Sequence, residues 1–242
     1  MKDDEIPHLS DLDRLTEPLI GPETAMPHDA SSVPIFQTSS FLFDRYEDMA
    51  AVFAGQSDRY IYTRGNNPTV AELEALIARM EGVEAARGFA SGMAAIASAV
   101  LPFVEAGSRV VAVNNLYSDA FRLFECVLKK FGVTTDYVDG TDTEAVLAAL
   151  PGASLIYLES PTSWSFTTQD LRAIGAEARR LGVISVIDNS WATPLFQRPA
   201  EFGIDLIIHA ASKYLAGHSD TIAGLVAGPK VLMDRINHEA YH

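Results

Sequence analysis

The chain has 242 residues, of which 48% are hydrophobic and 21% charged, a composition typical of a globular protein with one large domain or two small ones. Its formal net charge of −14 would repel nucleic acid and anionic lipid headgroups, so we expect neither as a partner. A single cysteine, Cys126, excludes an intramolecular disulfide, and we expect a packed thiol in a reducing compartment. The N-terminus has no apolar signal-peptide core, and no apolar run reaches the roughly 18 residues of a membrane span, so we expect a cytoplasmic protein.

The pattern of the chain changes near residue 60. Residues 1–60 are rich in Pro, Ser, Asp and Thr and predict an extended arm with little regular structure. Residues 61–242 alternate between helical patterns and short β-branched runs, which predicts one large domain. The expected strands are the runs at 109–115, 154–160, 183–189 and 204–210. Because these runs are apolar almost throughout, they indicate strands buried on both faces, and hence an α/β fold with a mostly parallel sheet between helices.

The first helix of the large domain is expected to begin at Pro68 and to end before Gly82. Thr69 and Glu72 have the spacing of a capping box, so we expect their side chains to satisfy the first N–H groups of this helix. Further helical patterns lie at 119–132 and 168–182.

Two strand ends bring opposite charges to one edge of the predicted sheet. In open α/β sheets, ligands bind beyond the carboxyl ends of the strands. Asp188 ends one apolar run, and Lys213 follows the next, where we expect a buried lysine that is paired or chemically bonded. One interpretation is a buried structural ion pair. The other is a site for pyridoxal phosphate (PLP), in which a lysine bonds to the cofactor aldehyde and an aspartate keeps the pyridine nitrogen protonated.

A PLP site also needs a phosphate cradle and a surface for the ring. Ser91, Gly92 and Met93 open an Ala-rich helix, whose free N–H groups and dipole would favour an anion; small residues there also serve helix packing. Tyr117 follows the run at 109–115 at the same sheet edge. It could stack on the cofactor ring, or it could be a half-buried loop tyrosine.

Five stretches of the chain resemble those of the PLP-dependent trans-sulfuration enzymes of Cys/Met metabolism, in order and approximate spacing. They are YIYTRGNNPTVAELE, FASGMAAI, YLESPTS, VIDNSWATP and SKYLAGHSD. The resemblance extends from about residue 30 to residue 228 and implies the fold type I architecture, with a seven-stranded sheet in the PLP-binding large domain. It also implies PLP as the cofactor and a small amino acid, such as cystathionine or a related thioether, as the substrate.

The resemblance further implies roles for particular residues. Lys213 would bond to the cofactor and move the substrate proton, and Tyr117 would stack on the ring and act in proton transfer. Tyr62 and Arg64 would reach the cofactor phosphate of a neighbouring subunit, which implies a homodimer within a homotetramer, and Arg suits phosphate as a bidentate partner. The implied cofactor-binding residues are Tyr62, Arg64, Gly92, Met93, Tyr117, Asp188, Ser212 and Lys213.

The chain departs from the family pattern at several positions. Ser163 stands where many members have Asn, and Ala210 stands where many have Ser; both changes resemble some β-lyases more than the γ-acting enzymes. Asp119 replaces the Cys of methionine γ-lyases, which argues against that member. Family members continue beyond the lysine into a smaller C-terminal domain, which we expect to be absent from this chain.

The expected activity is therefore β-elimination of the cystathionine β-lyase kind. One alternative is γ-replacement, as in cystathionine γ-synthase or O-acylhomoserine sulfhydrylase. Another is a truncated homologue that binds PLP without turnover. A third interpretation rests on the sequence HEAYH, which matches a zinc-peptidase motif with His238 and His242 as ligands and Glu239 as base, although the chain offers no obvious third ligand.

Overall fold

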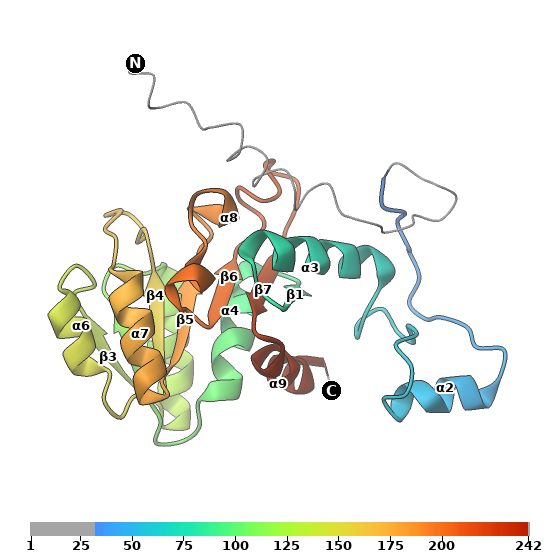
Figure 1. Cartoon of the computed structure of the whole chain (residues 1–242), viewed down its shortest axis with the longest axis horizontal. Coiled ribbons are helices and arrows are strands. Elements are labelled where there is room, and N and C mark those ends of the chain that lie inside the picture. The colour runs from blue at the N-terminus through green and yellow to red at the C-terminus, as the bar shows by residue number, and fades with distance from the viewer. Residues whose placement is uncertain (1–31, 242) are drawn as a thin grey trace, which may run out of the picture.

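The structure is a computed structural model that describes residues 32–241, and its centre is a seven-stranded sheet (Figure 1). The strands run in the order β1-β7-β6-β5-β4-β2-β3. Their bounds are β1 Ala85–Phe89, β2 Arg109–Val113, β3 Thr134–Val138, β4 Leu155–Glu159, β5 Ile184–Asp188, β6 Leu206–His209 and β7 Gly224–Gly228. Only the pairings of β7 with β1 and with β6 are antiparallel, so the predicted α/β fold with a mostly parallel sheet is confirmed.

The central strands are buried on both faces, as their apolar sequences predicted. In β4, the side chains of Leu155, Ile156, Tyr157 and Leu158 are completely buried. Successive side chains of a strand point to opposite faces. Leu155 and Tyr157 accordingly pack in one hydrophobic cluster, while Ile156 and Leu158 pack in another on the other face. The sheet is therefore the middle layer of three.

Helices form the two outer layers (Figure 1). One face of the sheet packs against α4 (Gly92–Val100), α5 (Ser118–Arg122) and α9 (Lys230–Tyr241). The other face packs against α3 (Pro68–Glu81), α6 (Thr143–Ala149) and α7 (Leu171–Leu181). None of the helices in residues 32–241 is both long and apolar enough to cross a membrane.

The helix predicted at 119–132 is helical but irregular. It consists of α5, a π-helical turn at Leu123–Val127 and a 3₁₀ turn at Leu128–Phe131. Cys126 lies in the π-helical turn with its side chain exposed, so the expectation of a packed thiol is wrong. The reason is that Phe124 and Leu128, on either side of it, supply the buried face of this segment.

Helix α3 begins and ends where the sequence predicted, but its cap is a different residue. Asn67 is the N-cap, and its side-chain oxygen accepts a hydrogen bond from the Thr69 N–H at 2.9 Å, with Pro68 in the first turn. The predicted capping box is therefore wrong: the Thr69 hydroxyl donates to the Pro34 carbonyl oxygen at 2.8 Å instead. Gly82 ends the helix in the left-handed conformation, at φ 70°.

The part of the predicted arm that the structure describes, residues 32–60, extends away from the sheet (Figure 1). It contains one helix that its composition did not predict, α2 (Tyr46–Phe53), and no residue of this helix is buried. The arm is attached at the start of α3, where the Asn67 side chain donates to the Phe36 carbonyl oxygen at 2.9 Å. The rest of the predicted arm, residues 1–31, lies outside the described residues.

Candidate active site

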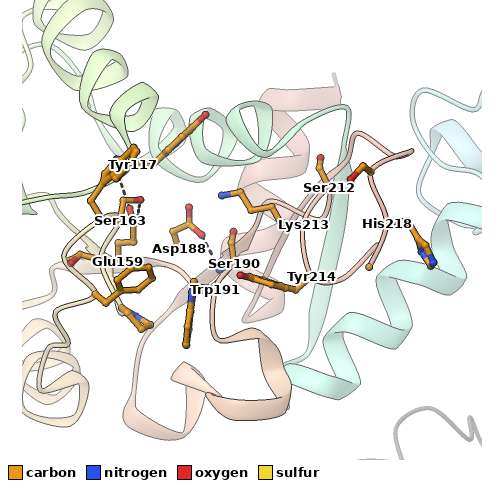
Figure 2. A pocket seen from close by; sticks show the side chains of 16 residues that line it. Tyr117, Glu159, Ser163, Asp188, Ser190, Trp191, Ser212, Lys213, Tyr214 and His218 are labelled. Carbon is orange, nitrogen blue, oxygen red and sulfur yellow. Dashed lines mark hydrogen bonds between the residues drawn. The ribbon is translucent and has the colours of Figure 1, made fainter.

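The ends of three neighbouring parallel strands open into a cavity of about 720 Å³ (Figure 2). Glu159 ends β4, Asp188 ends β5, and the turn that follows β6 carries Lys213; all three residues line the cavity. This is the edge at which open α/β sheets bind their ligands. The predicted meeting of Asp188 and Lys213 therefore occurs in the fold, because β5 and β6 are adjacent and parallel.

Asp188 is almost completely buried, with 7% of its surface exposed. Its Oδ1 accepts a hydrogen bond from the Ser190 N–H at 2.9 Å. Within residues 32–241 no basic side chain forms an ion pair with Asp188, so the interpretation as a structural Asp188–Lys213 ion pair is wrong. The carboxylate points into the cavity (Figure 2) and is available to a cationic group there.

Lys213 is exposed to the cavity and to solvent, which corrects the expectation of a buried lysine. The apolar residues before it are buried in β6, but Lys213 itself belongs to the turn that follows, where its N–H donates to the Ala210 carbonyl oxygen at 3.1 Å. Its Nζ lies 5.2 Å from the centroid of the Tyr117 ring. Figure 2 shows the amine pointing into the space between Tyr117 and Asp188.

Tyr117 is half-buried and precedes α5 at the wall of the cavity. Its N–H donates to Glu159 Oε2 at 2.7 Å, and its phenol donates to Asp119 Oδ2 at 3.0 Å. The hydrogen bond to Asp119, followed by burial and by the charges of Asp119 and Asp188, raises the pKa of the Tyr117 phenol. The ring is therefore neutral at physiological pH and is fixed at both ends.

Glu159 was not predicted as a site residue, although it ends its strand just as Asp188 does. Glu159 is 7% exposed, and its Oε1 accepts the Ser163 hydroxyl at 2.5 Å. Burial, and then the charge of Asp188, raises the pKa of Glu159, while the hydrogen bonds from Ser163 and Tyr117 oppose that shift. Ser163, which stands where many relatives have Asn, is thus engaged with Glu159.

The start of α4 lies against the segment that leads to Lys213. Ser91 caps the helix by accepting the Ala94 N–H at 3.1 Å. A Cβ atom on Gly92 would come within 2.8 Å of the Ala210 Cβ, so only glycine allows this approach. Ser212 lines the cavity, and its hydroxyl donates to the Ala223 carbonyl oxygen at 3.2 Å. Gly92 and Met93 are not among the residues that line the cavity.

Tyr62 and Arg64 lie elsewhere. Both side chains are exposed and line a second hollow, formed by the arm and the start of α3, so the fold of one chain does not bring them to Lys213. Trp191 and Phe166, which were not predicted from the sequence, also line the first cavity, and their ring centroids are 5.9 Å apart.

The described part of the chain offers what PLP requires at this edge: an amine for the aldehyde, a buried carboxylate that has no basic partner among residues 32–241 for the pyridine nitrogen, and an aromatic ring beside them. By contrast, residues 32–241 contain no group of three or more His, Cys, Asp or Glu side chains that could hold a metal ion. His242 of the zinc-peptidase motif lies outside the described residues.

The fold and this donor set define the class of fold type I PLP-dependent enzymes. The family model described as "Cys/Met metabolism PLP-dependent enzyme" matches residues 19–240, and the chain belongs to that family.

Individual relatives carry several activities. The chain is 41% identical to an L-methionine gamma-lyase of Pseudomonas putida, over 84% of this chain and 51% of the relative, and 38% identical to the chloroplastic cystathionine beta-lyase of Arabidopsis thaliana, over 83% and 42%. A Campylobacter jejuni structure assigned as an O-acetylhomoserine (thiol)-lyase, which carries a pyridoxyl-lysine phosphate, superposes with a TM-score of 0.85 at 30% identity, covering 92% of this chain and 55% of that one. The chain spans about half the length of the curated relatives it matches.

Proposed function

We propose that this chain provides the PLP site of a carbon–sulfur lyase, with Lys213 as the residue that bonds to the cofactor. The observation that carries this proposal is the placement of Lys213 and Asp188 in one cavity without an ion pair between them. Because Lys213 does not pair with Asp188, the buried carboxylate stays available to the protonated pyridine nitrogen of the cofactor. Membership of a PLP-dependent family supports the same conclusion.

In this proposal, each residue at the sheet edge holds a different part of PLP. Asp188 binds the pyridine nitrogen, and the Tyr117 ring packs on the cofactor ring. The N–H groups of Gly92 and Met93 at the start of α4, with the Ser212 hydroxyl, bind the phosphate. The family resemblance is what supports these main-chain contacts, since Gly92 and Met93 are not among the residues that line the cavity.

The protein residues would then move the protons. Bound PLP supplies an electron sink for the carbanion formed at the substrate Cα. Lys213 Nζ, freed when the substrate amine takes its place on the cofactor aldehyde, would take the Cα proton as general base, and Asp188 would keep the pyridine nitrogen protonated. The Tyr117 phenol, which is protonated at physiological pH, would give a proton to the leaving sulfur.

β-Elimination is the first candidate because it needs only the removal of the Cα proton and the departure of the sulfur. γ-Elimination is the second candidate, since it is the activity named for the Pseudomonas putida relative. That similarity runs against the expectation drawn from Asp119. Both candidate reactions cleave a carbon–sulfur bond. They differ in the number of proton transfers that Lys213 and Tyr117 must perform.

Trapping of the cofactor tests the site. After incubation with PLP and reduction with borohydride, mass spectrometry of peptides is expected to find a pyridoxyl group on Lys213. Lys213→Ala is expected to lose the visible absorbance of the bound cofactor, whereas Lys130→Ala, at an exposed lysine on a different turn, keeps it. A wild-type chain that takes up no PLP, or takes it up equally in both variants, contradicts the proposal.

Product analysis with cystathionine then separates the candidate reactions. β-Elimination releases pyruvate, ammonia and homocysteine, while γ-elimination releases 2-oxobutyrate, ammonia and cysteine. A pyridoxyl adduct without any release of product identifies a PLP-binding protein without turnover.

We also propose that two chains complete each site, with Tyr62 and Arg64 of one chain at the phosphate of the other. Their exposure and their distance from the Lys213 cavity support this arrangement. Mixing Arg64→Ala chains with Lys213→Ala chains tests it, because a mixed dimer regains one complete site and activity rises above either variant alone. No gain on mixing contradicts the shared site. A homotetramer in the cytoplasm is the assembly and location we propose, supported by the family resemblance and the single cysteine.

A further inference from the structure

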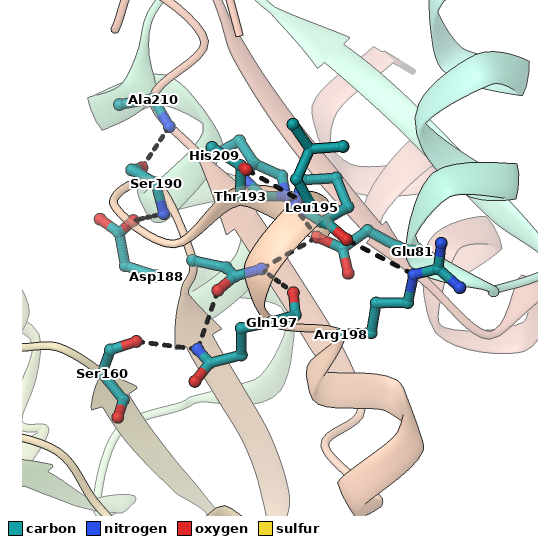
Figure 3. Close-up of polar contacts among 12 residues, drawn as sticks. Glu81, Ser160, Asp188, Ser190, Thr193, Leu195, Gln197, Arg198, His209 and Ala210 are labelled. Atoms are coloured by element: carbon teal, nitrogen blue, oxygen red, sulfur yellow. Dashed lines mark hydrogen bonds and ion pairs between the residues drawn. The ribbon is translucent and has the colours of Figure 1, made fainter. Parts of the chain in front are cut away.

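A cluster of buried polar side chains lies behind the candidate site (Figure 3). It consists of Glu81 at the end of α3, Asn189 directly after β5, His209 at the end of β6, and Gln197, which follows α8 (Thr193–Phe196). Glu81, Asn189 and His209 have no exposed surface at all. We refer to these four residues as the Glu81 cluster.

The Glu81 cluster is joined by short hydrogen bonds. Glu81 Oε1 lies 2.6 Å from His209 Nε2, and it also accepts from the Asn189 amide at 3.1 Å. The Gln197 amide donates to Asn189 Oδ1 at 2.9 Å and to the Ser160 carbonyl oxygen at 2.8 Å. The cluster therefore connects α3 with the ends of β4, β5 and β6, three strands that carry the candidate site.

Burial of such a polar cluster costs free energy. Burial of a carboxyl group and an imidazole removes both from water, and apolar residues of similar volume are often at least as stabilising. Two of its atoms, Glu81 Oε2 and His209 Nδ1, are buried and make no hydrogen bond within residues 32–241. Directional hydrogen bonds fix a unique arrangement of the segments they join, whereas apolar packing does not.

The segments joined by the cluster are the ones that position Asp188 and Lys213. Asn189 follows Asp188 in the chain, and its N–H donates to the Ile208 carbonyl oxygen at 2.9 Å. Ser190 makes a second connection: its N–H donates to Asp188 Oδ1, and its hydroxyl accepts the Ala210 N–H at 2.6 Å. Hence the strand end that carries Asp188 is tied directly to the turn that leads to Lys213.

The cluster and the cavity lie on opposite faces of the sheet. Asp188 is in register with Ile208, which packs with the cluster of core residues under α4, whereas His209 is in register with Leu225, which packs under α3. The Glu81 cluster therefore does not contact a ligand in the cavity. Any influence on PLP must pass through the backbone of the two strand ends.

We propose that the Glu81 cluster is a positioning device that sets the Asp188 carboxylate and the Lys213 turn for PLP. This inference rests on the proposed PLP site. Glu81→Gln keeps the size of the side chain but replaces the carboxyl group, whose Oε1 meets both the Asn189 amide and His209 Nε2, with an amide group. It is expected to weaken PLP binding on the order of tenfold to a hundredfold, the range for loss of a hydrogen bond to a charged group.

The test compares this variant with a control of equal burial in β5, the strand that ends at Asp188. Ser185 is fully buried at the start of β5, and its hydroxyl donates to Asp205 Oδ2 at 2.8 Å, at the end of the strand remote from the cavity. Ser185→Ala is expected to lower the unfolding temperature but to keep PLP affinity within about twofold. His209→Gln, whose amide can still donate to Glu81, is expected to restore much of the affinity that His209→Ala loses.

Three measurements on the purified full chain decide the matter: the PLP dissociation constant, the visible circular dichroism of bound PLP, and the unfolding temperature without PLP. The inference predicts weaker binding and altered dichroism for Glu81→Gln but not for Ser185→Ala. Wild-type affinity and dichroism in folded Glu81→Gln overturn it, as does equal loss of affinity in Ser185→Ala. If Glu81→Gln does not fold, Gln197→Ala, at a less buried member, must show the same two changes, and unchanged values overturn the inference. A wild-type chain that binds no PLP overturns the proposed function itself.

Discussion

Glu159 and Asp188 are paired residues at the ends of the adjacent parallel strands β4 and β5, so two buried carboxyl groups share one wall of the cavity. They are not equivalent. Glu159 accepts hydrogen bonds from the Ser163 hydroxyl and the Tyr117 N–H, whereas Asp188 accepts one from the Ser190 N–H. This leaves Asp188 more available to a cation in the cavity.

The first prediction follows from the raised pKa of Glu159, whose ordinary value is 4.5 and whose shift is caused first by burial and then by Asp188. A carboxyl group with a raised pKa stabilises the fold while it is protonated, and this contribution is lost as pH rises from the unfolded value through the folded one. Glu159→Gln does not titrate. The free energy of unfolding of the wild type should therefore fall relative to this variant as pH rises above about 4.5.

Denaturant unfolding at a series of pH values measures this difference. Ser163→Ala serves as the companion variant, because it removes a hydrogen bond that lowers the pKa of Glu159 and should extend the loss to higher pH. A difference between the wild type and Glu159→Gln that stays constant with pH, or that grows in favour of the wild type, contradicts the prediction.

The strands that the sequence revealed are those whose burial on both faces leaves a continuous apolar run. β1, β3 and β7 were not predicted. For β3 and β7, the reasons differ. β3 is largely uncovered and carries Thr and Asp. β7 is rich in glycine because its neighbours approach closely: a Cβ on Gly224 would come within 2.1 Å of the Ser91 carbonyl oxygen, and one on Gly228 within 2.6 Å of that of Asp205. A need for close approach does not produce an apolar pattern.

The candidate site, too, could be predicted from the sequence only where a local pattern indicated it. Asp188 and Lys213 were predicted because strand ends of a parallel sheet meet at one edge. Glu159 also ends an apolar run, 154–160, but no amine follows the neighbouring run in the chain to mark it as part of the same site. Glu81 and His209 are 128 positions apart in the sequence. No local pattern indicates which distant side chain a buried histidine will contact.

The second prediction concerns the phenol of Tyr117, which donates to Asp119. Because that hydrogen bond and the charge of Asp119 raise the pKa of Tyr117, Asp119→Asn should lower this pKa toward its ordinary value of 10.0. A ¹³C-tyrosine NMR titration measures the change, and the signal that disappears in Tyr117→Phe identifies the residue. Asp136→Asn, at an exposed carboxylate paired with Arg109, should leave the titration unchanged. An unchanged pKa in Asp119→Asn would contradict the prediction and leave burial and the charge of Asp188 as the causes of the shift.

The third prediction tests the contact between α4 and the segment before Lys213. Gly92→Ala places a Cβ 2.8 Å from the Ala210 Cβ and 3.1 Å from its Cα, so helix or turn must move. Overpacking of this kind costs about 1–3 kcal/mol. The unfolding temperature and PLP affinity should both fall. Gly65→Ala is the control for stability, since its Cβ meets only the Tyr62 carbonyl oxygen at 3.5 Å; equal unfolding temperatures for the two variants would contradict the prediction.

The fourth prediction separates stability from the site. Ile174 in α7 is fully buried against the face of the sheet that is remote from the cavity. Ile174→Ala removes buried methyl groups and leaves a cavity, which should cost about 2–5 kcal/mol of unfolding free energy. Val231→Ala, at a side chain that is 73% exposed, should change stability by no more than about 0.5 kcal/mol. Because Ile174 packs in an apolar cluster under α7 and is not among the residues that line the cavity, the folded Ile174→Ala chain should bind PLP as the wild type does. If it binds PLP as weakly as Glu81→Gln, loss of PLP affinity reports general loosening of the core and not the positioning of Asp188.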